Sequence, residues 1–134
     1  MARTYNPADL ALDDPTSLAW ALAWARRFAA DVPDGSGAWP DYSMTDEEWQ
    51  GWLNATAFKD ASGTVWYYPH VAAAKAIASM PNWVELLGVG GVYLNLRSAG
   101  EAAAAILKAG RWVERLVADK GGPAHPSTEI APRF

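Results

Sequence analysis

The chain has 134 residues and a net charge of −4, and 51% of its residues are hydrophobic against 19% that are charged. This balance predicts one soluble folded domain, and it argues against a disordered chain or a protein that coats nucleic acid with a basic face. The absence of cysteine excludes thiolate catalysis, disulfides and Cys-based metal sites, and two histidines are too few for a histidine-rich metal site. No apolar stretch approaches a membrane span, and acidic residues occupy the place of a signal peptide's apolar region, so we expect an intracellular protein.

A polar lead-in of 14 residues precedes a helix that the sequence predicts from residue 15 to about residue 31. An acidic residue followed by Pro15 is typical of a helix start. Leucines and alanines at i, i+4 spacing form one apolar face, and Trp20 and Trp24 occupy a second, adjoining face. A helix with two apolar faces is either wholly internal or packed against the core on one side and another subunit on the other.

Two further helix starts follow. Thr45 and Glu48 have the spacing of a capping box, which predicts a second helix as far as about Ala57. A turn and a short extended run then lead to Pro69, which opens a third, alanine-rich helix that continues through Ser79.

The segment 91–97 is the one stretch with strand periodicity. Two sets of side chains alternate along it: Val92, Leu94 and Leu96 on one side, and Tyr93, Asn95 and Arg97 on the other. A single strand cannot satisfy its own backbone N–H and C=O groups. Its partner is therefore expected to be residues 65–68 of the same chain or a strand from a neighbouring subunit.

The longest helix is predicted over about residues 99–120, with Trp112 in the middle of its apolar stripe and therefore among the most buried residues. Two glycines end it. The remainder, 121–134, is predicted to be an extended tail, in which Ile130 and Phe134 are apolar anchors for a neighbouring subunit or another protein.

The expected fold class is therefore mainly α, a small bundle of three to four helices with a minor β element around residues 91–97. The expected organisation is a lead-in over residues 1–14, a helical domain over 15–120 and an extended tail over 121–134.

No catalytic, cofactor-binding or metal site is predicted, and the chain is not expected to be an enzyme. His70 lies in a first helical turn with few acids near it in sequence, which favours a capping or core-edge histidine over a general base. Asp46, Glu47 and Glu48 begin a helix, and the helix macrodipole accounts for them without a metal. The glycines of 88–91 precede a strand and do not join a strand to a helix, so a phosphate loop is excluded.

Eight tryptophans are the unusual feature of the composition. Five of them fall on predicted apolar helix faces, which favours core and interface anchors over sugar-binding platforms. The candidate contacts with a partner are Trp20, Trp24, Tyr93, Ile130 and Phe134.

The order of these elements resembles a known family. A helix is followed by the Thr-Asp-Glu-Glu-Trp helix start at 45–49, by Tyr-Tyr-Pro-His opening an alanine-rich helix at 67–74, by a glycine-rich extended segment, and by a last helix that carries Ile-Leu-Lys-Ala-Gly at 106–110. Over about residues 14–120, the chain resembles the small helical head–tail adaptor proteins, also called head completion or connector proteins, of long-tailed bacteriophages and gene transfer agents.

The resemblance implies a virion protein, assembled in the host cytoplasm, that forms a ring beneath the portal protein and matches its twelve-fold symmetry. A stopper or tail-completion protein would dock below, and genomic DNA would pass through the ring without specific binding. The family has no catalytic residues, and no cofactor or membrane is implied. The acidic composition agrees, because an acidic lumen repels the phosphate backbone and lets DNA slide.

Two other classes of function remain open at this point. The first is a small helical regulatory or inhibitor-type binding protein that works as a monomer or dimer. The second is an enzyme that uses His70 together with an acid. The mass under native conditions distinguishes a ring from the first of these.

Overall fold

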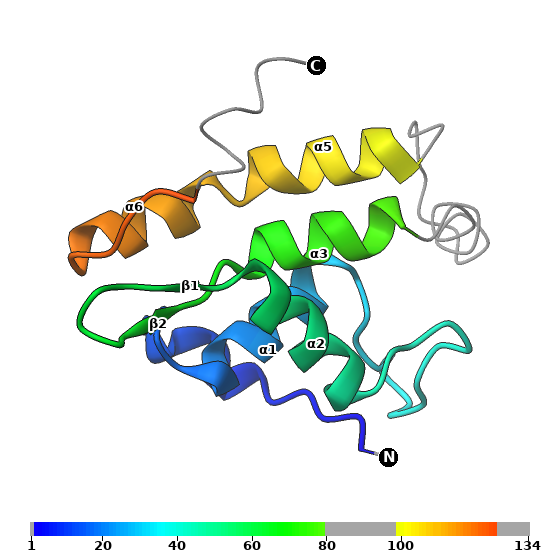
Figure 1. The fold of residues 1–134 in the computed structure, drawn as a ribbon. Coiled ribbons are helices and arrows are strands. Elements are labelled where there is room, and N and C mark those ends of the chain that lie inside the picture. Colours follow the sequence, from blue (N-terminus) through cyan, green and yellow to red (C-terminus); the bar gives the residue numbers. More distant parts are fainter. Residues whose placement is uncertain (1, 80–98, 126–134) are drawn as a thin grey trace.

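The computed structural model describes residues 2–79 and 99–125, and within them the chain is mainly helical (Figure 1). This confirms the predicted fold class. The elements in chain order are η1 (Pro7–Leu12), α1 (Leu18–Phe28), α2 (Asp46–Thr56), β1 (Phe58–Lys59), β2 (Val65–Trp66), α3 (Pro69–Ala78), α5 (Ala99–Ala109) and α6 (Arg111–Asp119). The predicted strand at 91–97 lies outside the described residues.

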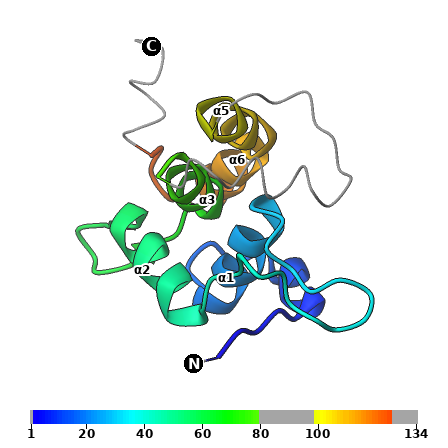
Figure 2. The ribbon, with the colours of Figure 1, turned by 90° about the vertical axis from the view of Figure 1, so that its right-hand side faces the viewer.

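Helix α3 lies at the centre of the bundle. In the two views, α5 covers it on one side, and α1 and α2 lie side by side against the other (Figures 1 and 2). Its sequence explains this position, because α3 is alanine-rich and apolar on nearly every face, and a helix that is apolar all round is buried. Alanine side chains also let the neighbouring helices approach closely.

Helix α1 is shorter than predicted. Ser17 caps its N-terminus by accepting a hydrogen bond from the backbone N–H of Trp20 (3.3 Å). At the other end, the N–H of Asp31 donates to the carbonyl of Arg26 (2.8 Å) while Ala30 has a positive φ of 57°, so the helix ends in a left-handed turn. The predicted end near residue 31 was therefore about three residues too late.

The capping box of α2 is confirmed. The hydroxyl of Thr45 accepts from the N–H of Glu48 (3.2 Å), and the carboxylate of Glu48 accepts from the N–H of Thr45 (3.0 Å). The lead-in is also fastened to this helix start, because the N–H of Asp46 donates to the carbonyl of Ala2 (2.9 Å).

A two-strand antiparallel hairpin follows α2, with Phe58 opposite Trp66 and Lys59 opposite Val65. The extended run at Val65 was predicted, and it was one of the two partners expected for the strand at 91–97, which lies outside the described residues. In the structure, Val65 and Trp66 pair with Lys59 and Phe58, which follow α2 after one intervening residue. Asp60 organises the connecting loop, since hydrogen bonds that its carboxylate accepts from Ser62, Trp66 and Thr64 lower the pKa of Asp60 to about 2.

The predicted single helix at 99–120 is wrong in one respect, because the helix breaks at Gly110 into α5 and α6. Gly110 lies directly on His70, where a Cβ atom at residue 110 would be 2.2 Å from the Cβ of His70. This split raises the number of α-helices in the described residues to five, against the three to four expected. Trp112 in α6 is only half-buried, which corrects the prediction that it is among the most buried residues.

Candidate contact face on helices α1 and α5

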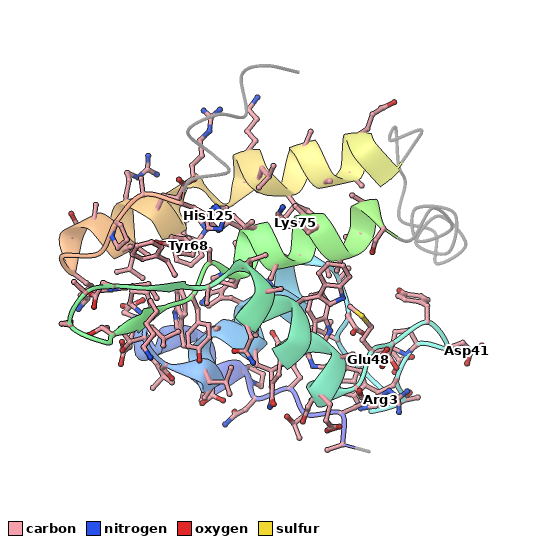
Figure 3. All side chains as sticks on the ribbon, in the orientation of Figure 1. Arg3, Asp41, Glu48, Tyr68, Lys75 and His125 are labelled. Atoms are coloured by element: carbon pink, nitrogen blue, oxygen red, sulfur yellow. The ribbon has the colours of Figure 1, made fainter. Side chains whose placement is uncertain are left out.

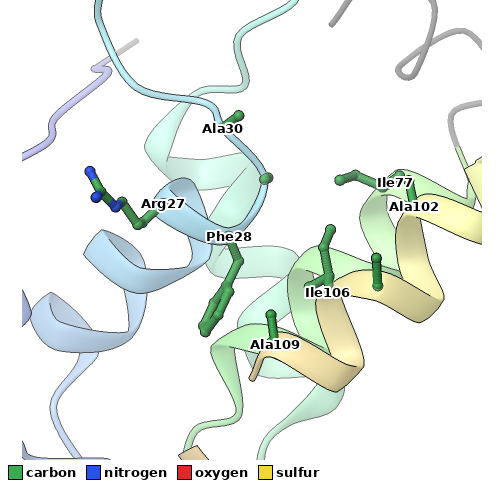
Figure 4. Close-up of a pocket in the computed structure, with 9 residues that line it drawn as sticks. Arg27, Phe28, Ala30, Ile77, Ala102, Ile106 and Ala109 are labelled. Carbon is green, nitrogen blue, oxygen red and sulfur yellow. The ribbon is translucent and has the colours of Figure 1, made fainter. Parts of the chain in front are cut away.

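An apolar groove opens between the end of α1, the end of α3 and the length of α5 (Figure 4). Its volume is about 320 Å³. Phe28, Ile77 and Ile106 supply its large apolar side chains, and Arg27 is the one charged residue among the described residues that line it. The remaining lining residues are all alanines: Ala29, Ala30, Ala102, Ala105 and Ala109.

Small side chains create this groove. Ala102, Ala105 and Ala109 share one side of α5, at the spacing that places helical residues above one another. Ala102 is buried and belongs to the floor, whereas Ala105 and Ala109 are exposed and form the edge. Because none of these side chains extends beyond a methyl group, α5 leaves apolar space open to its surroundings.

An aromatic cluster continues the groove towards α6. The ring centroid of Trp24 lies 4.6 Å from that of Trp112 and 5.5 Å from that of Phe28. All three side chains are half-buried. Phe28 belongs to both features, so the groove and the rings of Trp24 and Trp112 form one surface, which we call the contact face.

The structure describes two of the five residues predicted to contact a partner, and it places them in different surroundings. Trp24 lies on the contact face, and its indole N–H donates to the carbonyl of Leu10 (3.0 Å). Trp20 is wholly buried within the chain, with 0% of its surface exposed, so it is a core residue and its assignment as a partner contact was wrong. The physical reason is that α1 turns the Trp20 side towards the core. Tyr93, Ile130 and Phe134 lie outside the described residues.

His70 is a fully buried residue of α3. Its Nε2 atom lies 3.3 Å from a carboxylate oxygen of Glu114 on α6. Burial lowers the pKa of His70, while the hydrogen bond and the charge of Glu114 act in the opposite direction. The sequence showed no acid near His70 because Glu114 is 44 residues away along the chain. With none of its surface exposed, His70 is a residue of the core.

The structure contains a buried ionic network that the sequence did not predict. Arg26 has no exposed surface, and its guanidinium contacts a carboxylate oxygen of Asp31 (2.9 Å) and one of Asp46 (2.7 Å). The same oxygen of Asp31 accepts the indole N–H of Trp49 (2.8 Å). For Asp46, burial raises the pKa, but hydrogen bonds from Arg26 and Thr4 outweigh burial and lower it. The helix macrodipole is therefore only part of the reason for an acid at Asp46.

Within residues 2–79 and 99–125, the structure shows no group of three or more His, Asp or Glu side chains able to hold a metal ion. No helix in that part of the chain is long and apolar enough to cross a membrane.

No protein-family model matches this chain, and comparisons with curated proteins and with solved structures give no match. Support for a function therefore comes from the contact face and from the order of the elements.

Proposed function

We propose that this chain is a head–tail adaptor of a long-tailed bacteriophage or gene transfer agent. Its copies form a ring on the portal protein, connect the portal to a stopper or tail-completion protein, and continue the DNA channel. The observation that carries this proposal is the contact face, an apolar groove joined to half-buried tryptophans on one side of the molecule.

The aromatic part of the contact face, Trp24, Phe28 and Trp112, has side chains typical of a subunit interface. Aromatic side chains are enriched at protein–protein interfaces, and tryptophan supplies a large share of binding energy when a partner covers it. The groove of the contact face is lined by residues of α1, α3 and α5 and by the two residues after α1, and α2 contributes none of the described lining residues. A surface on one side that meets a different surface of the next copy makes a head-to-tail contact, and such contacts form a ring when the rotation between successive copies closes.

The arrangement of the elements also supports the proposal. The segments that carry the resemblance form α2, α3 and α5, and α3 packs between the other two. The net charge of −4 is compatible with a channel through which DNA slides, because negative charge does not hold the phosphate backbone.

The test introduces one charge into the groove. Ala105 and Ala104 are adjacent, exposed alanines on α5, but only Ala105 lines the groove. We expect Ala105→Glu to leave the thermal melt unchanged and to reduce assembly at least tenfold, because a carboxylate there must lose its hydration when an apolar partner covers it. Ala104→Glu, which adds the same charge beside the groove, should assemble like the parent chain.

Assembly is measured by light scattering of the chain mixed at micromolar concentration with the portal protein of the same phage or gene transfer agent. A discrete ring-sized complex of the parent chain supports the proposal. A parent chain that stays separate from the portal contradicts the function. A parent chain that assembles, together with an Ala105→Glu variant that assembles equally well, contradicts the assignment of the contact face.

A second candidate function rests on the same groove. A cavity of about 320 Å³ has room for a bulky apolar side chain of one partner, which also suits a regulatory or inhibitor-type binding protein. Such a protein forms a one-to-one complex, so the mass of the complex distinguishes it from a ring.

A further inference from the structure

The residues that follow α6 turn back onto the bundle. We call residues 121–125 the strap. Gly121 has a positive φ of 91°, which reverses the chain, and the N–H of Gly122 then donates to the carbonyl of Val117 (2.8 Å). A Cβ atom at Gly122 would lie 2.5 Å from a methyl group of Val117 and 2.7 Å from the ring of Trp66, so the backbone itself is packed. The first residues of the predicted extended tail are therefore part of the folded bundle.

Two side chains fasten the rest of the strap. The hydroxyl of Tyr68 donates to the carbonyl of Pro123 (2.6 Å), and Nε2 of His125 lies 2.9 Å from the carbonyl of Thr56 at the end of α2. The rings of Tyr68 and His125 pack edge to face with their centroids 4.7 Å apart, and Figure 3 labels them beside each other. Burial, with the charge of Glu114 adding to it, raises the pKa of Tyr68 to about 12, so this donor keeps its proton.

The hydrogen bond between His125 and Thr56 needs only the neutral form of the imidazole ring. A carbonyl only accepts hydrogen bonds, so Nε2 of His125 must carry the proton that it donates to Thr56, and the neutral tautomer with a proton on Nε2 already provides it. A further proton adds a charge to a buried ring without being needed for this bond. Burial lowers the pKa of His125, and the charge of Lys75 lowers it further, while the hydrogen bond to Thr56 and the charge of Glu114 oppose them.

Charges of both signs surround His125. Among the described residues, Lys75 and His70 on α3 and Glu114 on α6 act on His125 through their charges, and the ring of Tyr68 packs against it. Glu114 is already within 3.3 Å of Nε2 of His70. The other ring nitrogen of His70, Nδ1, is buried with no hydrogen-bond partner in the described part of the chain, so a proton there would be a buried donor without an acceptor. Both histidines of the chain thus lie in one cluster that favours their neutral forms.

We propose that His125 is a proton-sensitive latch: protonation of its ring releases the strap from the bundle, while the helices remain folded. The inference does not depend on the chain's proposed role as an adaptor, because it rests on contacts within one chain.

The direction of the pH effect follows from comparing His125 in the closed strap with His125 in the released strap. In the released strap, His125 is in water and titrates near its ordinary value of about 6.5. Above that pH both states are neutral, and the ratio of closed to released strap does not change with pH. As the pH falls below about 6.5, the released state takes up the proton first, so this ratio falls by as much as tenfold per pH unit.

The test uses the full chain. Because the chain has two histidines, its proton NMR spectrum contains two titrating imidazole Cε1–H signals, and His125→Gln assigns them. We expect the His125 signal to titrate below its ordinary range. Hydrogen exchange at Gly122, corrected for the intrinsic effect of pH on exchange, should become several-fold faster between pH 7.5 and pH 5.5, while amides of α2 and α3 stay protected.

Two variants separate the latch from a general loosening. Glutamine in His125→Gln still donates to the carbonyl of Thr56 but does not titrate, so exchange at Gly122 should become independent of pH. Tyr68→Phe loses the bond to Pro123 and should accelerate exchange by the same factor at both pH values, with the pH dependence intact.

Three results would each overturn the inference. They are a His125 signal that titrates at or above its ordinary value, an unchanged pH dependence in His125→Gln, and a simultaneous loss of protection by the strap and by α2 and α3. Should His125→Gln fail to fold, the titration and the exchange of the parent chain still decide between these outcomes.

Discussion

Gly110 determines where the last helix of the bundle breaks. Its Cα rests on the side chain of His70, and the nearest atoms to an added Cβ are the Cβ and ring carbons of that buried histidine. These atoms are held by the backbone of α3 and are not the mobile end of a long side chain. The absence of a side chain at residue 110 therefore allows α3 and the α5–α6 junction to approach.

Gly110→Ala should lower the free energy of unfolding by about 1–3 kcal/mol, because an overpacked contact forces the backbone to shift. Gly51→Ala is the matched control. Gly51 lies in the exposed middle of α2, with nothing within 4 Å of an added Cβ, and alanine there should stabilise by about 0.5–1 kcal/mol through helix propensity. Urea denaturation of both variants measures the difference, and equal effects of the same sign would contradict the close approach at Gly110.

The tryptophans of α1 and α6 differ in burial. Trp20→Ala should cost about 3–5 kcal/mol, because the residue is wholly enclosed and the change leaves a cavity. Trp112→Ala should cost less, about 1–3 kcal/mol, because its ring is only partly buried, although it loses contacts with Trp20, Trp24 and Phe28. Chemical denaturation gives both values, and a larger cost at Trp112 would show that the rotation of α6 is wrong.

Among the elements, the Arg26 network joins two different helices and a loop. Arg26 is near the end of α1, Asp31 follows that helix, and Asp46 begins α2. Asp31 also accepts the N–H of Met44 (3.0 Å), and Asp46 accepts the N–H of Thr4 (2.8 Å). One buried cation thus holds together the end of α1, the start of α2 and the lead-in.

Arg26→Leu should lower the free energy of unfolding by about 3–5 kcal/mol, because it leaves two buried carboxylates without their counter-charge. Arg27→Leu is its control on the same helix. Arg27 is exposed at the rim of the groove, and its replacement should change stability by no more than about 0.5 kcal/mol. Thermal and urea denaturation compare the two, and a small effect at Arg26 would mean that its ion pairs are not formed.

At the scale of the whole molecule, α3 connects the two sides of the bundle. It contacts α5 above and α1 and α2 below, and His70 in its first turn is paired with α6. Because the central helix is shared, its buried groups affect the stability of the entire fold, including the response to acid.

The stability of the whole fold should decrease below about pH 6.5, since burial holds the pKa of His70 below its ordinary value. The unfolded chain takes up a proton first as the pH falls, so the folded state loses at most about 1.4 kcal/mol per pH unit for this histidine, until it is protonated as well. In His125→Gln, His70 is the one remaining histidine, so its contribution can be measured separately. Urea denaturation of that variant from pH 7.5 to 5.0 measures the effect, and a flat profile would contradict a buried, neutral His70.

Local signals in the sequence determined much of the fold. The capping box at Thr45 and Glu48, the proline that opens α3 and the alanine-rich pattern after it each involve residues within one or two turns of one another. The energies behind them are local, because a cap or a missing N–H acts on its own helix end. For that reason the helical class and three of the four predicted helix segments could be identified from the sequence.

Only the tertiary structure decided which residues meet. The pairing of His70 with Glu114, the network of Arg26, the break at Gly110 and the return of His125 to Thr56 all join residues that are distant along the chain or meet only when helices pack. The same applies to Trp20, whose position on a predicted apolar face did not reveal that the core, and not a partner, covers it. Periodicity places a side chain on a face of its helix, but the packing of the other helices determines what that face contacts.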